Sequence, residues 1–507
     1  MPSQLFATKS LAQLHEEMAG ENRLRRVLGP VQLSSLGIGA IIGAGIFVAT
    51  GAAAHNVAGP ALMLSYVVAG VTCIFAALCY AEFASMVPVA GSAYTYAYAT
   101  LGELFAWVIG WDLILEYAVG AATVANGWSG YFQSVLAKFG LILPATLAGP
   151  PIIYDTTAGH FVRTAGVINL PAVLVVALMT VILVKGIQES AGFNAAMVAL
   201  KITAVFFVIL VGAFYINPSN WHPFAPYGYT GVSFFGHTLF GQTNAGGQPV
   251  GMIAGAAIIF FAYIGFDSVS THAEEAKNPS RDVPIGIIAS LLICTVLYIA
   301  VVAVLTGMVS YGKLSEDAGV SDAFKQAGLP WAEFIIAAAG VAGITSVLLV
   351  MMLSAPRVFL AMARDGMVPP SFFAAIHDRF RTPWKSTILI GAFVALMAGF
   401  LPIDALLHMT NIGTLFAFLV VCAAVLIMRR TNPDAKRPFR APFYPFVPIL
   451  GILSCLLLMF SLPVENWYRL IIWMLIGFVL YFSYGYRHSA LRLRTQRLAA
   501  AGGSSRR

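Results

Sequence analysis

Glycine interrupts the first long apolar segment of the chain, in the stretch GIGAIIGAGIF (residues 37–47). The sixth apolar segment is interrupted in the same way by Gly265, in FFAYIGFD (residues 260–267). A helix that unwinds inside a membrane leaves backbone N–H and C=O groups unpaired, and each costs several kcal/mol unless it lines a polar cavity or binds something. Paired breaks in the two halves of one chain therefore indicate the substrate site of a transporter.

The composition indicates an integral membrane protein. Of the 507 residues, 59% are hydrophobic and 10% are charged, and the mean hydropathy is +0.82, whereas soluble domains carry about 25% charged residues. An apolar segment of about 20 residues is long enough to cross a membrane as a helix. We predict twelve spans, of which the third is overlong and the ninth short, at residues 31–53, 61–87, 105–134, 167–186, 193–216, 250–273, 284–310, 332–360, 387–402, 405–428, 443–462 and 467–486.

Both ends of the chain are predicted to lie in the cytoplasm, with the spans in the plasma membrane. Residues 1–28 contain acidic and basic side chains and no apolar run, which argues against a cleavable signal peptide. Residues 488–507 form a basic tail directly after the last span. With both ends inside, the cytoplasmic segments hold most of the 29 Lys and Arg residues, as the positive-inside rule requires. The net charge of +7 therefore indicates contact with anionic membrane lipids and not with nucleic acid.

The two glycine breaks also suggest how the chain is organised. Gly43 and Gly265 each lie in the opening helix of a block of five predicted spans. Because five is an odd number, the second block crosses the membrane in the opposite sense, which gives an inverted-topology repeat. We predict one transporter domain at 29–487, with a first repeat at 29–216, a second repeat at 250–428, and helices 11 and 12 at 443–486.

The first glycine string has two alternative interpretations, a dinucleotide-binding motif and a site of helix packing. A dinucleotide fingerprint needs a preceding strand and a βαβ unit, which twelve membrane spans do not offer. Gly39 and Gly43 also form a GxxxG pair, which lets two membrane helices approach closely. Five glycines between Gly37 and Gly51 exceed what packing needs, so packing and unwinding are both expected on different faces.

The two breaks together suit an α-amino acid. The half-helix that begins after the first break presents free N–H groups and the positive end of its dipole, which favour a carboxylate. The half-helix that ends at the sixth-span break presents free carbonyls, which favour an ammonium group. Backbone recognition of this kind defines the class of substrate and leaves the preferred side chain open.

Two ionisable residues are expected deep in the membrane, where charge is costly and usually functional. Glu116 lies about 15 Å along the third span from Ala106, near the middle of the bilayer. It is interpreted either as a structural carboxylate or as one that faces the substrate. Lys201 lies about 12 Å into the fifth span. Unless it extends to the interface, desolvation lets it load and lose a proton in place of a bound sodium ion, which makes it the candidate for proton coupling.

Other charged residues are assigned less direct roles. Asp267 follows the sixth-span break and is expected to cap or orient the second half-helix. Glu82 and Asp112 are expected in intracellular or interfacial hydrogen-bond networks. We predict no metal site and no cofactor, because His272 beside Glu274 and Glu275 is more typical of a solvated helix end. The five cysteines lie in apolar runs without metal-like spacing and are expected to be buried free thiols.

Four stretches resemble the amino acid–polyamine–organocation superfamily, and within it the cationic amino acid transporter group and its bacterial relatives. They are GIGAIIGAGIFV (37–48), the segment from YAEF to SGYF (80–132), FFAYIGFDSVSTHAEEAKNPSRDVPIGII (260–288) and SAPRVFLAMARDGMVP (354–369). The resemblance covers most of residues 25–480. It implies an all-α integral membrane protein with the leucine-transporter fold, twelve transmembrane helices, discontinuous helices 1 and 6, and alternating access.

The resemblance also implies roles for individual residues. The substrate carboxylate is expected at Ile41, Gly43, Ala44 and Gly45, and the ammonium at carbonyls of Phe261, Ala262 and Ile264. Glu116 matches a cavity acid, and Lys201 matches a buried lysine in the position of a sodium ion. Ala44 departs from bacterial relatives that have Thr there, so binding at this point would rest on backbone N–H groups. Thr345 and Ser346 are further candidates for the cavity lining.

These observations predict a secondary active transporter that moves L-amino acids, by symport with protons. Exchange of one amino acid for another, or for an amine, is the alternative mechanism. A non-transporting amino acid sensor is the alternative from another class, although the termini are too short for a signalling domain. A membrane enzyme is not supported, because no nucleophile, base and oxyanion hole come together. The expected partners are the amino acid, protons and membrane lipids, and whether a small membrane partner exists is left open.

Overall fold

The computed structural model describes residues 4–9, 28–86, 92–155, 160–186, 191–235, 237–244, 246–314 and 319–494. Most of the cytoplasmic segment predicted at 1–28 and the end of the basic tail predicted at 488–507 therefore lie outside the described residues. Helices dominate what is described, and one continuous hydrophobic core runs through them.

The helices follow the apolar segments of the sequence, and a helix overlaps every range predicted above to be a span. Between the N-terminus and the middle of the chain they are α2 (Pro30–Ile41), η2 (Gly45–Ala49), α3 (Thr50–Ala53), η3 (Ala54–Ala58), η4 (Gly59–Ala61), α4 (Leu62–Met86), α5 (Ser92–Thr100), α6 (Glu103–Lys138), α7 (Ala145–Ala148), α8 (Leu170–Lys185) and α9 (Ala191–Ala213). The second half contains α10 (Met252–Ile259), η6 (Phe260–Tyr263), α11 (Ser268–Thr271), α12 (Pro279–Met308), α13 (Gly319–Gln326), α14 (Pro330–Arg364), α15 (Pro370–Phe373), α16 (Trp384–Phe400), α17 (Ile403–Thr431), α18 (Phe446–Met459), α19 (Val464–Leu480), η9 (Tyr481–Gly485) and α20 (Tyr486–His488).

Length and composition make this a multi-pass membrane protein. Among the described residues, eight helical stretches are long and apolar enough to cross a membrane, and the first of them, Pro30–Met86, joins two predicted spans. The helices α8, α16 and α18 are apolar but shorter. Large apolar side chains such as Val296 and Leu178 point outward and are more than half exposed, which is favourable only where the surroundings are hydrocarbon.

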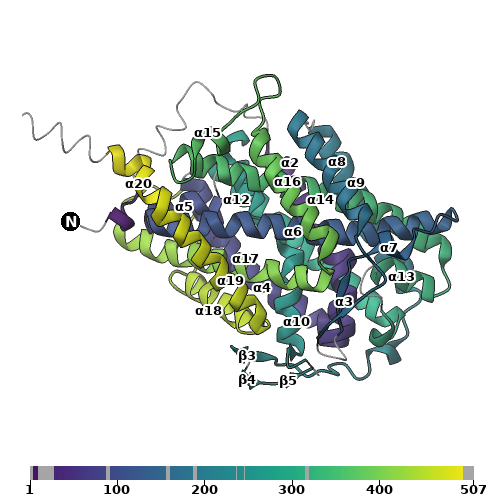
Figure 1. Ribbon diagram of the computed structural model, residues 1–507. Helices are drawn as coiled ribbons and strands as arrows, with labels where there is room; N and C mark the ends of the chain where they lie inside the picture. The colour runs from purple at the N-terminus through teal and green to yellow at the C-terminus, as the bar shows by residue number, and fades with distance from the viewer. Residues whose placement is uncertain are drawn as a thin grey trace, which may run out of the picture.

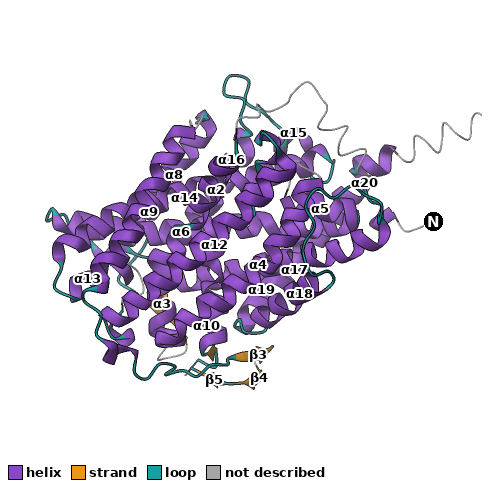
Figure 2. Cartoon of the chain, turned by 180° about the vertical axis from the view of Figure 1, so that it is seen from behind, coloured by secondary structure: helices purple, strands orange, loops and turns teal. Residues whose placement is uncertain are grey.

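The long helix α6 runs through the centre of the molecule and packs against α14 and α17, while α4 packs against α12 (Figure 1). The N-terminal residues, α5, α15 and α20 gather at one end, toward the upper left of Figure 1. The helices α7 and α13 and the strands β3, β4 and β5 lie at the opposite end, and the view from behind shows the same separation (Figure 2). The connections therefore divide between two faces with the spans between them.

The connections after the third and fifth predicted spans contain short strands. Within the described residues, β1 (Ile152–Asp155) pairs with β2 (His160–Arg163), β3 (Val232–Phe234) with β4 (His237–Phe240), and β5 (Gln242–Thr243) with β6 (Pro249–Val250), all antiparallel. Strands this short depend on packing against the rest of the molecule for stability. Local sequence alone therefore did not indicate them.

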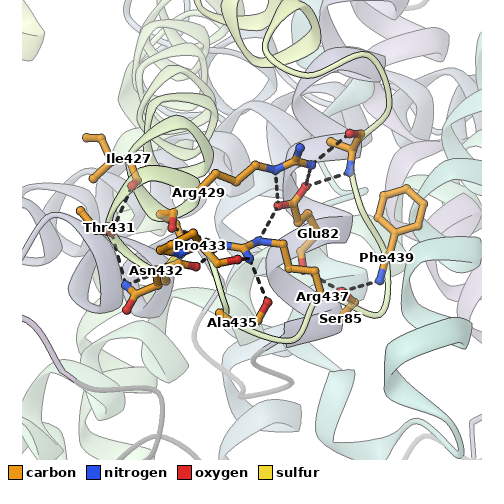
Figure 3. A network of polar contacts seen from close by, with 12 residues as sticks. Glu82, Ser85, Ile427, Arg429, Thr431, Asn432, Pro433, Ala435, Arg437 and Phe439 are labelled. Carbon is orange, nitrogen blue, oxygen red and sulfur yellow. Dashed lines mark hydrogen bonds and ion pairs between the residues drawn. The ribbon is translucent and has the colours of Figure 1, made fainter.

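A buried ion-pair network ties α4 to the connection between α17 and α18 (Figure 3). Arg429 donates to both carboxylate oxygens of Glu82, at 2.9 and 2.5 Å. The same carboxylate accepts from the Ala441 N–H at 2.8 Å and lies 3.4 Å from Nε of Arg437. Arg437 also donates to four backbone carbonyls of residues 428–435. The network expected around Glu82 is thus present, and it holds this connection against the end of α4.

Candidate functional site

The first break lies between α2 and η2. The helix α2 ends at Ile41, Ile42 is extended with φ −71° and ψ 106°, and the chain resumes at Gly45 as a π-helix. Gly43 faces α14 so closely that a Cβ atom on it would lie 2.5 Å from Cγ2 of Val347. The close packing therefore favours glycine where the helix is interrupted, because a Cβ atom there would force the Val347 side chain to shift.

The second break lies between η6 and α11. After the 3-10 turn of η6, Ile264 is extended with φ −59° and ψ 130°, and Gly265 has a φ of +126° that other residues rarely adopt. A Cβ atom on Gly265 would lie 2.9 Å from the backbone carbon of Ala40. Both the dihedral angle and the close approach to α2 thus select glycine at this position.

The two breaks lie against each other, although their residues are far apart in the sequence. A Cβ atom on Gly45 would overlap the Cα of Ala262, and Gly265 contacts Ala40. The hydroxyl of Tyr298 on α12 lies 2.8 Å from the carbonyl oxygen of Ile41 and 3.1 Å from that of Ala262. One side chain therefore serves a carbonyl from each interrupted segment.

The carbonyls at the sixth-span break keep acceptor capacity. The Phe261 oxygen accepts from the Ile264 N–H at 3.2 Å, and the Ala262 oxygen faces Tyr298. Each carbonyl has two lone pairs, so both can accept a further hydrogen bond. The side-chain amide of Asn411 on α17 donates to Ala257 and Ile258 at 2.9 and 2.8 Å, which satisfies the carbonyls one turn earlier.

The N–H groups at the first break belong to Gly43, Ala44 and Gly45, at the start of a half-helix. The first N–H groups of a helix have no acceptor within it, and Ala44 adds no hydroxyl that could compete for a ligand. Further along this half-helix, the Phe47 carbonyl accepts from the hydroxyl of Tyr131 on α6 at 2.6 Å. This bond anchors the segment to α6.

Lys201 lies inside the protein and does not extend to the interface. Its side chain is 1% exposed, and its Nζ donates to the carbonyl oxygen of Gly39 at 2.5 Å. A Cβ atom on Gly343 would lie 3.3 Å from Cγ of Lys201. The ammonium group of α9 thus binds the last turn of α2 before the first break, beside α14.

Three carboxyl groups lie close together on the other side of the sixth-span break. Asp267 accepts from the Gly265 N–H at 3.2 Å and from the hydroxyl of Tyr117 at 2.9 Å, so it orients the break as expected. Glu116 lies near Asp267, Asp112 and Thr414, and neither of its carboxylate oxygens has a hydrogen-bond partner among the described residues. Asp112 is 1% exposed and lies beside Gly413 of α17, and its Oδ2 has no hydrogen-bond partner among the described residues. Its place in an intracellular or interfacial network stays a prediction.

The two candidates on α14 face in different directions. The Thr345 hydroxyl accepts from Nε1 of Trp128 at 2.8 Å and donates to the Val341 carbonyl at 2.7 Å. The Ser346 hydroxyl donates to the Gly343 carbonyl at 3.1 Å. Val347, which follows them, contacts Gly43. Thr345 therefore contributes first to the contact between α6 and α14, and it precedes by two residues the Val347 that meets Gly43.

Three residues of this region were not identified from the sequence. Tyr298, Tyr131 and Asn411 are all fully or nearly fully buried, and each donates to a backbone carbonyl of an interrupted helix. A polar side chain within an apolar helix needs a partner when it is buried. That requirement is the signal that could have drawn attention to them, although it does not indicate the partner.

Comparison with known proteins places this arrangement in a family. The profile of the family described as amino acid permease matches residues 28–481. The chain is 45% identical over 492 residues to the branched-chain amino acid permease BcaP of Bacillus subtilis (strain 168), which covers 97% of this chain and 100% of that protein. It is 44% identical over 489 residues to the methylthioribose transporter of the same organism, and the alignment covers 96% of this chain and 99% of that transporter. It is 37% identical over 432 residues to the human cationic amino acid transporter 4, and the alignment covers 83% of this chain and 63% of that transporter.

The helices are long and apolar enough to cross a membrane, and two interrupted segments meet among them. Together these features define the class of the protein, which is a multi-pass membrane transport protein. The chain belongs to the amino acid permease family, within the amino acid–polyamine–organocation superfamily. Since the family and these relatives are permeases and transporters, the protein is not an enzyme.

Proposed function

We propose that this protein is a secondary active transporter that imports L-amino acids across the plasma membrane by symport with protons. The observation that carries the proposal is the contact between the two interrupted segments, at Gly45 with Ala262 and at Gly265 with Ala40. It brings the N–H groups of one half-helix and the carbonyls of the other into one region, as an α-carboxylate and an α-ammonium group require.

The fold that goes with this function has twelve transmembrane helices in two inverted repeats of five, followed by two more. The long stretch Pro30–Met86 contains two spans, and the shorter apolar helices α8, α16 and α18 supply spans beside the long ones. In the first repeat, α2 with η2 corresponds to α10 with η6 in the second. Alternating access would then consist of rocking one group of helices against the other around the two breaks, with both termini in the cytoplasm.

Lys201 is proposed as the proton-coupling group. Its ammonium group contacts the Gly39 carbonyl, two residues before the end of α2, and a cation at this point holds α2 against α9 and α14. Loss of the proton would remove that cation and weaken the contact. The protonation state of one side chain would therefore bias the position of the helix that carries the carboxylate site.

The substrate side chain is proposed to face Glu116. Its unpartnered carboxyl oxygens supply polarity next to Asp267 and the sixth-span break. The similarity to branched-chain and to cationic amino acid transporters makes both neutral and cationic amino acids candidate substrates. The similarity to a methylthioribose transporter adds a second candidate class, a thiosugar without an α-amino acid group.

A competition experiment separates these classes. The purified protein is reconstituted in proteoliposomes, and binding and uptake of labelled leucine are measured. Excess unlabelled leucine, alanine, arginine or methylthioribose is added as the competitor. Competition by the amino acids, and its loss when the α-carboxylate is converted to an amide, is the expected result. Competition by methylthioribose alone would contradict amino acid recognition, and binding without uptake would favour a sensor.

A further inference from the structure

A cavity lies away from the two breaks, between α6, α14, α15, α16 and α19. Its volume is about 450 Å³, which is within the range of small-molecule sites. Its lining side chains are apolar or aromatic, and they include Trp107, Trp111, Phe373, Leu389, Trp473 and Tyr484. None of these residues belongs to either interrupted segment.

The inner wall of this cavity offers only hydrocarbon to an occupant. Nε1 of Trp111 donates to the Trp473 carbonyl and Nε1 of Trp473 to the Trp111 carbonyl, each at 2.9 Å, and the two rings stack 4.3 Å apart. Nε1 of Trp107 donates to the Gly477 carbonyl at 3.0 Å. Because all three indole N–H groups are bonded to backbone, these tryptophans present an almost entirely apolar surface to the cavity, which does not favour a polar ligand.

The mouth of the cavity opens to the membrane. Leu389 and Phe393 of α16 and Leu480 of α19 line it, and these side chains are 43%, 39% and 42% exposed. In a membrane-spanning helix, exposed leucine and phenylalanine face lipid tails. An acyl chain can therefore enter from the bilayer without crossing a polar layer.

A basic side chain marks the level of the lipid headgroups next to this mouth. Nζ of Lys385 lies 5.7 Å from the ring centre of Trp384 and 5.9 Å from that of Phe372, whose neighbour Phe373 lines the cavity. Tyr484, also in the lining, stacks on His488 at 4.1 Å. Trp and Tyr are enriched at the membrane–water interface, and α15, α16 and α20 share this end of the molecule in both views (Figures 1 and 2).

We propose that this cavity binds one acyl chain of an anionic phospholipid, with the phosphate beside Lys385. Leu389 and Phe393 follow Lys385 by about 6 and 12 Å along the same helix, so a chain that starts at the headgroup level passes both. The positive charge selects an anionic headgroup, and the aromatic wall holds the tail. The cavity wall also includes Ile114 and Leu115, the two residues before Glu116, so the lipid supports the part of α6 that carries the candidate substrate carboxylate.

Native mass spectrometry with matched variants tests the site. The purified protein is titrated with phosphatidylglycerol or phosphatidylcholine of identical acyl chains. Leu389→Trp fills the mouth and is expected to lower retention of phosphatidylglycerol at least tenfold, whereas Leu396→Trp, at a lipid-facing position of the same helix outside the cavity lining, leaves it unchanged. Lys385→Gln is expected to reduce the preference for phosphatidylglycerol about fivefold, and Lys436→Gln in the connection after α17 serves as the charge control.

Photocrosslinking locates the chain independently of affinity. Phosphatidylglycerol with a diazirine near the end of one acyl chain is expected to label peptides that contain Trp107 or Phe359, and Leu389→Trp is expected to abolish that label. Equal retention by Leu389→Trp and the wild type, equal retention of the two lipids by the wild type, or labelling spread evenly over all lipid-facing helices would each overturn the proposal.

Discussion

Gly45 and Ala262 are in such close contact that a Cβ atom on Gly45 would overlap the Cα of Ala262. The two residues belong to the interrupted first and sixth apolar segments, so the breaks form one structure. Gly45 is therefore needed for a contact between backbones and not only for flexibility.

Gly45→Ala is expected to separate the two breaks. Inserting a methyl group into a packed contact costs about 1–3 kcal/mol, and here the nearest atoms are backbone atoms that cannot rotate away. We expect uptake to fall at least tenfold while the protein still reaches the membrane. The matched control is Gly312→Ala, where the added Cβ meets nothing within 4 Å. Uptake at the wild-type rate in Gly45→Ala would show that the contact is not required.

Tyr298→Phe tests the hydroxyl group between the Ile41 and Ala262 carbonyls. Removing a hydrogen bond of this kind costs about 1 kcal/mol, so we expect a several-fold rise in the apparent KM for the amino acid. The ring remains and keeps its packing against Tyr66 and Tyr263. The exposed Tyr215→Phe is the control, and identical KM values for the two variants would remove Tyr298 from the site.

Glu116→Gln tests whether the unpartnered carboxyl faces the substrate. Glutamine keeps the shape of the side chain and removes its ability to ionise. In a competition assay, we therefore expect the ratio of the inhibition constants of arginine and leucine to change at least fivefold. Glu465→Gln at an exposed position of α19 is the control. A competition profile that does not change would return Glu116 to a structural role.

Arg429→Ala is expected to destabilise the protein without altering substrate preference. Breaking a buried ion pair costs about 3–5 kcal/mol, and the side chain of Glu82 is only 3% exposed. The loss of stability should lie near the lower end of this range, because Nε of Arg437 remains 3.4 Å from the Glu82 carboxylate. Thermal unfolding in detergent measures it, with the neighbouring exposed Arg430→Ala as the control. Equal unfolding temperatures of the two variants would argue against an anchoring role for this network.

The sequence predicted the positions of the interrupted helices because glycine in an apolar segment has a direct physical cause. Gly43 packs against the Val347 side chain and Gly265 against the backbone of Ala40, and a missing side chain can be seen in a sequence. For Lys201 the sequence left burial and extension to the interface open, and the structure shows burial.

The side chains that bind the interrupted segments were harder to predict from the sequence. Tyr298 and Asn411 donate to carbonyls of segments far away in the chain, and no periodicity indicates which turn they meet. The contact of Asp112 with Gly413 of α17 was equally hidden, because its distance from the helix end does not show which helix it faces. The lipid-facing cavity likewise depends on how five helices converge, which their separate apolar patterns do not specify.

Concentrative uptake by proteoliposomes tests the central proposal most directly, with the wild type, Lys201→Met and the surface control Lys185→Met. Labelled leucine, alanine and arginine are offered with and without an inward proton gradient, and again with unlabelled amino acid inside. We expect the gradient to drive accumulation by the wild type and by Lys185→Met. Lys201→Met should lose this accumulation and keep exchange against internal amino acid. Gradient-driven accumulation by Lys201→Met, or wild-type uptake that occurs only against internal amino acid, would contradict proton symport through Lys201.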